Sequence, residues 1–281
     1  MNTPHVLGII GNALAESLSP TLHNALLQHH GLDYVYLPFQ VERRHLKNLI
    51  PCMRLTDVGG LNVTAPYKCA VIPLLDRLDR TAQQIGAVNT IVLRRGRYVG
   101  YNTDAAGFLA ALQHTHRRTP RGLRVTVIGA GGTARAVTAA VLAHGAATLT
   151  LLNRTCSHAT RLGREFRRHF PRANIAAQPL TPATLRAACL ESDLLVQTSA
   201  APRCGRGALL WPTRCRPAGL TLLDVRYGTG DNVFLHAARR AGVRCSDGRE
   251  MLLQQAALSF HLWTGKTAAL PVLRRITQGH L

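Results

Sequence analysis

Lysine is scarce in this chain of 281 residues, which has 31 arginines but only three lysines, at positions 47, 68 and 266. Acidic residues are also few, so the formal net charge is +20 and the sequence pI is about 11.1. Such a balance is the electrostatic footprint of nucleic-acid binding. The arginines, however, are scattered singly or in pairs, without a dense run interleaved with aromatic residues. The composition therefore favours a solvated basic surface over a specific nucleic-acid site, and it makes Lys68 stand out.

The chain also lacks the features of membrane, secreted and metal-binding proteins. It has no uncharged apolar run of about 18 residues or more, and residues 1–5 do not have the pattern of a signal peptide. The seven cysteines are an odd number without any Cys-x-x-Cys spacing, which is typical of reduced structural thiols. We therefore expect a cytoplasmic protein without membrane attachment and without a bound metal.

Length and hydrophobicity predict a two-lobed globular enzyme. With 281 residues, 46% of them hydrophobic, the chain can bury a full core. Ser19 and Pro20 have the pattern of a helix start, with Ser19 as N-cap and Pro20 at the first helical position. Periodicity in the first part predicts strands at 5–10, 34–39 and 60–64, and helices at 20–30, at 43–53 and from 70 to 75. The fold class is therefore α/β.

A glycine-rich turn indicates a nucleotide-binding lobe from about residue 105 to residue 245. A strand predicted at 123–128 runs into Gly129-Ala130-Gly131-Gly132-Thr133-Ala134 and then into a helix that ends near His144. These glycines allow a tight turn and a close approach of pyrophosphate to the helix N-terminus. The strand at 148–152 ends in Asn153-Arg154-Thr155, where an arginine suits a 2′-phosphate, so NADP is favoured over NAD. Further strands are predicted at 194–197 and 222–225.

Three polar segments ahead of this turn indicate the chemistry. They supply amides, hydroxyls, one lysine and one carboxylate, and they span Asn62 to Lys68, Gly86 to Thr90 and Asn102 to Asp104. A polyhydroxylated substrate needs such side chains for its orientation, and hydride transfer at one of its carbons needs a proton donor or acceptor. The sequence thus predicts an oxidoreductase. A helical pattern over 247–270 is mostly core, and Gln255 either packs there or projects its amide into the cleft between the two lobes.

Together these motifs resemble those of shikimate dehydrogenases, in the shikimate/quinate dehydrogenase family. The resemblance is carried by Ser17 to Pro20, Asn62 to Lys68, Ile85 to Thr90, Asn102 to Asp104, Gly129 to Gly132, Asn153 to Thr155 and Asp247 to Gln255. It implies a substrate-binding and catalytic domain at 1–104, a Rossmann-type NADP-binding domain at 105–246, and C-terminal helices at 247–281 that pack on the first domain. The implied protein is a monomer or homodimer that acts on a small molecule, and on neither nucleic acid nor membrane.

The resemblance also implies an activity and a role for individual residues. The activity is the reversible NADPH-dependent reduction of 3-dehydroshikimate to shikimate, a step toward aromatic amino acids. Lys68 is the implied proton donor and acceptor, and Asp104 orients it. The implied substrate-binding residues are Ser17 and Ser19 for the carboxylate, and Asn62, Thr64, Asn89, Asp104, Gln255 and Tyr227. The implied cofactor-binding residues are Gly129, Ala130, Gly131, Gly132, Thr133, Ala134, Asn153, Arg154, Thr155, Val225, Gly248 and Met251.

The departures from the family pattern all fall in the predicted cofactor lobe. The segment 197–203 lacks the usual glycine and methionine, and 227–232 keeps Tyr227 but loses the usual proline and threonine. His158 stands where many relatives have a second arginine. We therefore expect that substrate choice is retained while the preference for NADP is weakened.

Two other functions remain open at this point. One is a paralogous dehydrogenase that acts on quinate or a related cyclohexane acid with NAD, but the serine pair at 17 and 19 and Arg154 favour shikimate and NADP. The other is a metabolite sensor that has lost turnover. A sensor needs the binding amides but not a proton-transfer pair, so the presence of both Lys68 and Asp104 favours an enzyme.

Overall fold

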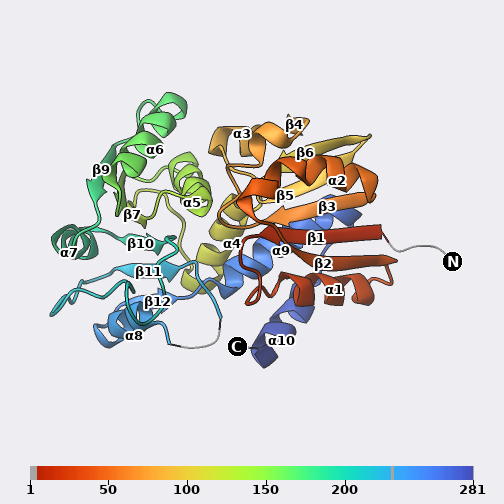
Figure 1. The fold of residues 1–281 in the computed structure, drawn as a ribbon. Helices are drawn as coiled ribbons and strands as arrows, with labels where there is room; N and C mark the ends of the chain where they lie inside the picture. Colours follow the sequence, from red (N-terminus) through yellow and green to blue (C-terminus); the bar gives the residue numbers. More distant parts are fainter. Residues whose placement is uncertain (1–4, 229–230, 281) are drawn as a thin grey trace. The chain divides into compact units, whose positions relative to one another are not determined.

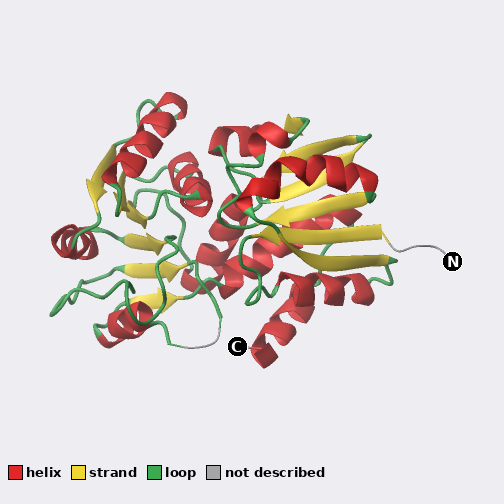
Figure 2. Ribbon diagram, viewed as in Figure 1, coloured by secondary structure: helices red, strands yellow, loops and turns green. Residues whose placement is uncertain are grey.

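A computed structural model describes residues 5–228 and 231–280, so Thr229 and Gly230 of the altered segment lie outside the described residues. The chain forms two compact units, each built on one sheet with helices packed against it (Figures 1 and 2). The first unit comprises residues 1–107 and 252–281, and the second comprises 108–251. Both boundaries fall inside helices, so α4 (Asp104–His116) and α9 (Arg249–Thr264) each contribute to both units.

The first unit contains a mixed six-stranded sheet in the order β2-β1-β3-β5-β6-β4. Its strands are β1 (His5–Gly11), β2 (Tyr34–Gln40), β3 (Val58–Val63), β4 (Arg77–Leu78), β5 (Thr90–Arg94) and β6 (Arg97–Tyr101). Strand β1 pairs parallel with β2 and β3, whereas β5 pairs antiparallel with β3 and β6. As a result, the ends of β1, β3 and β6 and the start of β5 lie at one edge of the sheet.

The helices of this unit differ from the sequence prediction in four places. They are α1 (Ser19–His29), η1 (Arg43–Asn48), α2 (Leu49–Leu55), η2 (Ile72–Leu74), α3 (Arg80–Ile85), the start of α4, most of α9, and α10 (Leu270–His280). The prediction of Ser19 as N-cap was wrong. Leu18 is the N-cap, and its helix-like φ and ψ make Ser19 the first helical residue.

Proline and glycine account for the other three corrections. The predicted helix at 43–53 is a 3-10 helix followed by α2, because Pro51 has no N–H to donate to the carbonyl of residue 47. The helix predicted from 70 to 75 is only the short 3-10 helix η2, which contains Pro73. The helical pattern predicted over 247–270 is too long, since α9 ends at Thr264 and Gly265 follows with φ +70°, whereas α9 and α10 agree with the C-terminal helices predicted over 247–281.

The second unit has the topology of a dinucleotide-binding fold. Its six strands are all parallel, in the order β12-β11-β10-β7-β8-β9. The strands are β7 (Arg124–Ile128), β8 (Thr148–Asn153), β9 (Ile175–Pro179), β10 (Leu194–Gln197), β11 (Thr221–Asp224) and β12 (Arg244–Ser246). Numbered within the unit and read from β9, this is the order 3-2-1-4-5-6, and the direction of winding reverses between β7 and β10. Ligands bind at such a reversal, beyond the carboxyl ends of the strands.

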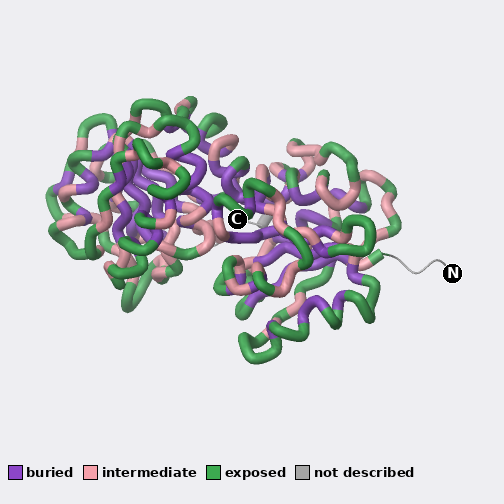
Figure 3. Tube along the Cα trace, turned by 90° about the horizontal axis from the view of Figure 1, so that it is seen from above, coloured by how far each residue is buried: buried purple, intermediate pink, exposed green. Residues whose placement is uncertain are grey.

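Helices connect these strands, and buried segments run through the interior of each unit (Figure 3). The helices of the second unit are α5 (Gly132–Ala143), α6 (Cys156–His169), α7 (Pro182–Glu191) and α8 (Val233–Arg240), with parts of α4 and α9. Within the described residues, no helix is long and apolar enough to cross a membrane. All seven cysteines are free, and burial raises the pKa of the Cys245 thiol to about 11.

Candidate active site

The polar segments predicted from the sequence meet at one edge of the first sheet. Ser17 and Ser19 follow β1, and residues 64–68 follow β3. Asn89 directly precedes β5, and residues 102–104 directly follow β6. The backbone N–H of Thr64 donates to the carbonyl of Ile10 at the end of β1, which holds the two loops together. The topology therefore gathers residues from four separate stretches of sequence at one place.

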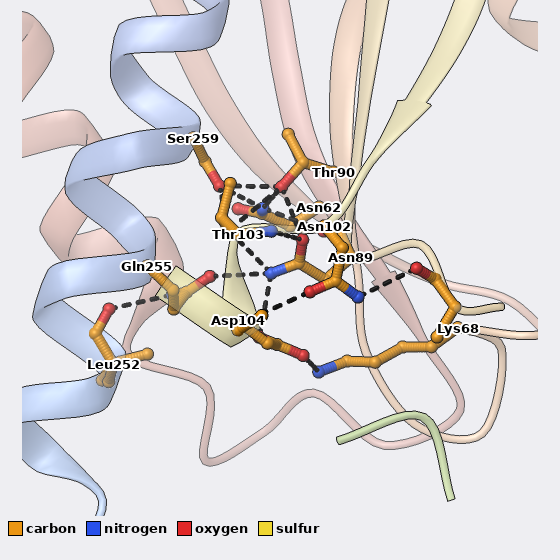
Figure 4. A network of polar contacts seen from close by, with 12 residues as sticks. Asn62, Lys68, Asn89, Thr90, Asn102, Thr103, Asp104, Leu252, Gln255 and Ser259 are labelled. Carbon is orange, nitrogen blue, oxygen red and sulfur yellow. Dashed lines mark hydrogen bonds and ion pairs between the residues drawn. The ribbon is translucent and has the colours of Figure 1, made fainter. Parts of the chain in front are cut away.

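Lys68 and Asp104 form a close ion pair at this edge. Lys68 Nζ lies 2.5 Å from Asp104 Oδ2, and the two side chains are 13% and 5% exposed. Asp104 is the first residue of α4, where the positive end of the helix dipole stabilises a carboxylate. The pair is thus largely withdrawn from water, and its lysine is a candidate proton donor at the edge of the network (Figure 4).

The amide of Asn89 fixes the other oxygen of this carboxylate. Asn89 Nδ2 donates to Asp104 Oδ1 at 2.9 Å and to Thr103 Oγ1 at 2.8 Å. Asn89 Oδ1 accepts from the backbone N–H of Thr103 at 2.7 Å. A backbone N–H can only donate and a carboxylate can only accept, so the two ends of the amide are unambiguous. Asp104 is therefore held from both sides, by Lys68 and by Asn89.

Asn62 lies one layer further from the ion pair and is buried. Its Oδ1 accepts from the Tyr36 hydroxyl at 2.7 Å, and its Nδ2 donates to the Asn89 carbonyl at 3.1 Å. The same nitrogen lies 3.2 Å from the hydroxyls of Thr90 and Ser259. Asn62 therefore joins β2, β3, β5 and α9 in a single polar cluster.

Gln255 also contributes its amide to this cluster. Its Oε1 accepts from Asn89 Nδ2 at 3.3 Å, and its Nε2 donates to the Leu252 carbonyl at 2.9 Å (Figure 4). Gly107 of α4 makes this possible, because a Cβ there would lie 2.9 Å from both Gln255 Cβ and Gln255 N. Helices α4 and α9 therefore approach each other closely at Gly107 and Gln255.

Ser17, Ser19 and Thr64 lie at the same edge without being part of the cluster in Figure 4. Ser19 is buried at the first position of α1, and its N–H lies 3.4 Å from Ser17 Oγ. Thr64 is half-buried directly after β3. The last predicted substrate residue, Tyr227, belongs to the second unit, where it follows β11.

The glycine turn of the second unit is shaped for an anion. Gly129 follows β7 with φ +116°, and a Cβ there would lie 2.6 Å from Thr198 Oγ1, so only glycine fits without strain. Gly131 has no atom within 4 Å of a Cβ built on it, so the turn is open there. Gly131 is also the N-cap of α5 and has no side chain to cap the helix. The first N–H groups of α5 can therefore face a pyrophosphate, as NADP requires.

The remaining predicted cofactor residues fall into two groups. Arg154 and Thr155 are exposed after β8, and Asn153 Nδ2 donates to the Thr155 carbonyl at 2.9 Å, which shapes this turn. Val225 and Gly248 touch, since a Cβ on Gly248 would overlap the Val225 carbonyl. Met251 is buried, with 5% of its surface exposed.

The altered loop after β10 is held by a buried ion pair. Arg226 Nη2 lies 2.5 Å from Oδ2 of Asp224, which is fully buried, and Arg226 Nη1 donates to the carbonyls of Ala201 and Pro202. The loop therefore has a fixed anchor although it lacks the glycine and methionine usual in the family.

Family models match three segments of the chain. The shikimate dehydrogenase substrate binding domain matches residues 9–91, the shikimate / quinate 5-dehydrogenase model matches 111–204, and the shikimate 5′-dehydrogenase C-terminal domain matches 248–276. A curated relative from Geobacter sulfurreducens, shikimate dehydrogenase (NADP(+)), is 41% identical over 92% of this chain and 91% of its own length. The chain belongs to the shikimate dehydrogenase family.

Solved structures of family members have the same fold over nearly the whole chain. Shikimate 5-dehydrogenase from Thermus thermophilus, in complex with NADP(H) and shikimate, has a TM-score of 0.84 and 31% identity, covering 99% of this chain and 100% of that one. Quinate dehydrogenase from Corynebacterium glutamicum, in complex with NAD, has a TM-score of 0.85 and 29% identity with the same coverage. The two-lobed α/β prediction is confirmed, whereas fold likeness alone does not separate shikimate from quinate.

Sequence reasoning gave no role to four residues that the structure places in the cluster. They are Tyr36, Thr90, Thr103 and Ser259. Thr90 and Thr103 lie inside motifs that were already singled out. Ser259 follows Gln255 by four residues on a helix, so the two share a face, and this spacing was the signal that could have identified it.

Proposed function

We propose that this chain catalyses the reversible NADPH-dependent reduction of 3-dehydroshikimate to shikimate. The observation that carries the proposal is the buried Lys68–Asp104 pair inside a cluster of amides and hydroxyls at one sheet edge. Membership of the shikimate dehydrogenase family and the NADP-dependent relatives support it.

The substrate carboxylate binds at Ser17 and Ser19 in this proposal. Both residues lie at the start of α1, whose N-terminal end favours negative charge. Thr64, Asn89, Asp104 and Gln255 hold the ring hydroxyls together with Asn62, and Tyr227 is a further proposed substrate-binding residue. The hydrogen bonds of Asn89 to Thr103 and Asp104 hold its amide in place beside the carboxylate.

Proton transfer is the task of Lys68. Reduction adds a hydride to the carbonyl carbon and a proton to its oxygen. Lys68 Nζ donates that proton and then regains one from solvent, while Asp104 keeps the amine oriented and stabilises its charged form. In the oxidation direction the amine accepts the proton of the substrate hydroxyl. Asp104 contributes through charge and position and need not itself be protonated.

The second unit holds the cofactor, and NADPH when bound supplies the hydride. Residues 129–134 would hold the pyrophosphate, and Asn153, Arg154 and Thr155 would hold the 2′-phosphate of the adenosine ribose. Val225, Gly248 and Met251 complete the binding surface in this proposal. We also propose that the chain works in the cytoplasm as a monomer or homodimer, where reducing conditions suit its free cysteines.

Initial rates with shikimate or quinate, each with NADP or NAD, test the function directly. The rates are measured by the absorbance of the reduced nicotinamide. The proposal predicts the highest kcat/KM for shikimate with NADP. Preferred turnover of quinate with NAD would assign the chain to the paralogous activity. Binding of shikimate without turnover in any combination would favour a sensor.

A further inference from the structure

We propose that Ser259 is a positioning residue for this reaction, acting through Thr90 on Asn89 and thereby on the Asp104 carboxylate. The inference rests on the proposed function, because it explains how the Lys68–Asp104 pair is kept in place. It adds a residue that does not touch the pair: three hydrogen bonds separate Ser259 from Asp104.

Ser259 lies where four segments of the first unit converge. It is fully buried on α9, one helical turn beyond Gln255. Its Oγ lies 2.8 Å from Thr90 Oγ1, 3.1 Å from Thr103 Oγ1 and 3.2 Å from Asn62 Nδ2. A single small hydroxyl thus links α9 to β5, to the loop before α4 and to β3 (Figure 4).

The hydrogen-bond directions along this path are determined by its fixed ends. Asn89 Oδ1 must accept, because the Thr103 N–H donates to it, so Thr90 donates its only hydroxyl hydrogen to that oxygen at 3.0 Å. Thr90 Oγ1 is then an acceptor for Ser259, and Ser259 in turn accepts from Asn62 Nδ2. The donors therefore run from Ser259 to Thr90, from Thr90 to Asn89, and from Asn89 Nδ2 to Asp104.

This ordered path couples two contacts that α9 makes with the same amide. Gln255 accepts directly from Asn89 Nδ2, and Ser259 supports Asn89 Oδ1 through Thr90. Loss of the Ser259 hydroxyl removes the shortest hydrogen bond to Thr90 Oγ1, at 2.8 Å, and leaves Asn62 Nδ2 at 3.2 Å as the remaining donor, so the Thr90 hydroxyl is held less firmly against Asn89. The Asn89 amide, and with it the carboxylate that orients Lys68, then loses one of the supports of its position.

The test compares kcat and KM in five variants. Ser259→Ala removes the hydroxyl, and Thr90→Val removes the next one without changing side-chain shape. The double variant tests whether both act along one path. Thr90→Ser keeps the hydroxyl and serves as the conservative rescue. Ser192→Ala is the matched control, since Ser192 makes an equally buried hydroxyl pair with Thr126 at 2.8 Å, in the second unit.

The inference predicts that Ser259→Ala and Thr90→Val each lower kcat about tenfold, with KM for NADP unchanged. The double variant is no slower than the slower single variant, Thr90→Ser recovers most of the loss, and Ser192→Ala lowers the melting temperature but not kcat. A larger solvent deuterium isotope effect on kcat is also expected in Ser259→Ala and Thr90→Val, but not in Ser192→Ala, because proton transfer becomes slower.

Equal kcat in Ser259→Ala and Ser192→Ala would overturn the inference. If Ser259→Ala does not fold, the threonine pair decides, and equal kcat in Thr90→Val and Thr90→Ser overturns it. Absence of turnover in the unmodified protein would instead overturn the proposed function. The two failures are therefore distinguishable.

Discussion

The two units hold their functional groups in opposite ways. In the first unit, the central residues of the candidate site are buried and hydrogen-bonded in one cluster, as with Asn89, Asp104 and Ser259. In the second, the functional groups are backbone N–H groups at an open glycine turn and exposed side chains such as Arg154. The first arrangement depends on the identity of each side chain, whereas the second depends on backbone shape. The departures from the family pattern, at 158, 197–203 and 227–232, lie in the second unit.

The two units also differ in net charge. Residues 108–251 carry 21 arginines and no lysine against seven acidic residues, whereas the other unit carries 13 arginines and lysines against seven. A cofactor with three phosphate groups is attracted to the more basic unit without a specific contact for each charge. We therefore expect the absence of a second arginine at position 158 to weaken the preference for NADP without abolishing NADP binding.

Replacement of Asp104 should have the largest effect and would test the dependence on side-chain identity. Asp104→Asn keeps the shape but removes the charge that holds Lys68, so kcat should fall about 100-fold or more. The affinity for NADP should not change, because the cofactor residues belong to the other unit. Steady-state rates and calorimetric NADP titrations check both statements. A variant within threefold of the unmodified kcat would contradict the proposed role.

Replacement of Gly129 should have the next largest effect and would test the dependence on backbone shape. Gly129→Ala places a Cβ against Thr198 at φ +116°, which strains the turn by about 1–3 kcal/mol and should weaken NADP binding at least tenfold. Gly131→Ala is the matched control, since its Cβ would have no protein atom within 4 Å. Any loss of NADP affinity in this variant would come from a clash with the cofactor itself. Shikimate affinity should be unchanged in both, and a parallel loss would contradict the separation of roles.

Replacement of Arg154 should have a moderate effect on cofactor affinity that is selective for NADP. Arg154→Gln removes a charged hydrogen-bond donor, so NADP affinity should fall about 10- to 100-fold while NAD affinity stays the same. With only this arginine in the turn, we expect the unmodified protein to prefer NADPH over NADH by less than about a hundredfold in kcat/KM. A much larger preference would show that NADP selectivity has not weakened.

Buried histidines should lower the stability of both units in acid. This effect is smaller than those above, and it allows the stability of the two units to be compared. Burial lowers the pKa of His23 in the first unit to about 3, and the Asn62 side chain offsets only part of this. Burial, with Arg244 and Arg118, lowers the pKa of His116 in the second unit to about 4. In the unfolded chain a histidine has a pKa of about 6.5, so the unfolded state binds the extra proton and stability falls as the pH drops below that value.

The expected slope is about 1.4 kcal/mol per pH unit and per histidine, down to the folded-state pKa of each. His23→Phe removes the titrating imidazole but keeps a ring that can stack on Tyr36. The pH dependence of stability should therefore become flatter in the first unit only. Urea unfolding at pH 7 and pH 5 can follow each unit by its own tryptophan, Trp263 in the first and Trp211 in the second. An unchanged slope at Trp263 in the variant would contradict this assignment.

The sequence predicted the parts of the site that depend on local order along the chain. The polar segments after β3 and β6 and before β5 were identified because they lie next to recognisable strands, and strand order then brings them together. The glycine turn was identifiable because its flanking strand and helix are contiguous with it. In both cases neighbouring residues define the feature.

Contacts between distant residues could not be predicted in the same way. Ser259 is separated from Thr90 by 169 positions, and its hydroxyl contact depends on how α9 packs on the sheet. The contact of Gln255 with Asn89 likewise depends on Gly107 and the close approach of α4. The Ser-Pro pattern also predicted the wrong N-cap for α1, because Leu18, the residue before Ser19, already has helical φ and ψ.

Lys68→Met, assayed beside the unmodified protein, tests the central claim most directly. Calorimetry gives the affinity of each protein for shikimate, and initial rates with shikimate and NADP give kcat. The account predicts that the variant binds shikimate nearly as well but that its kcat falls about 100- to 10,000-fold, because methionine fills the space without supplying a proton donor. A variant that retains kcat within tenfold of the unmodified protein would contradict the assignment of Lys68 as the proton-transfer group.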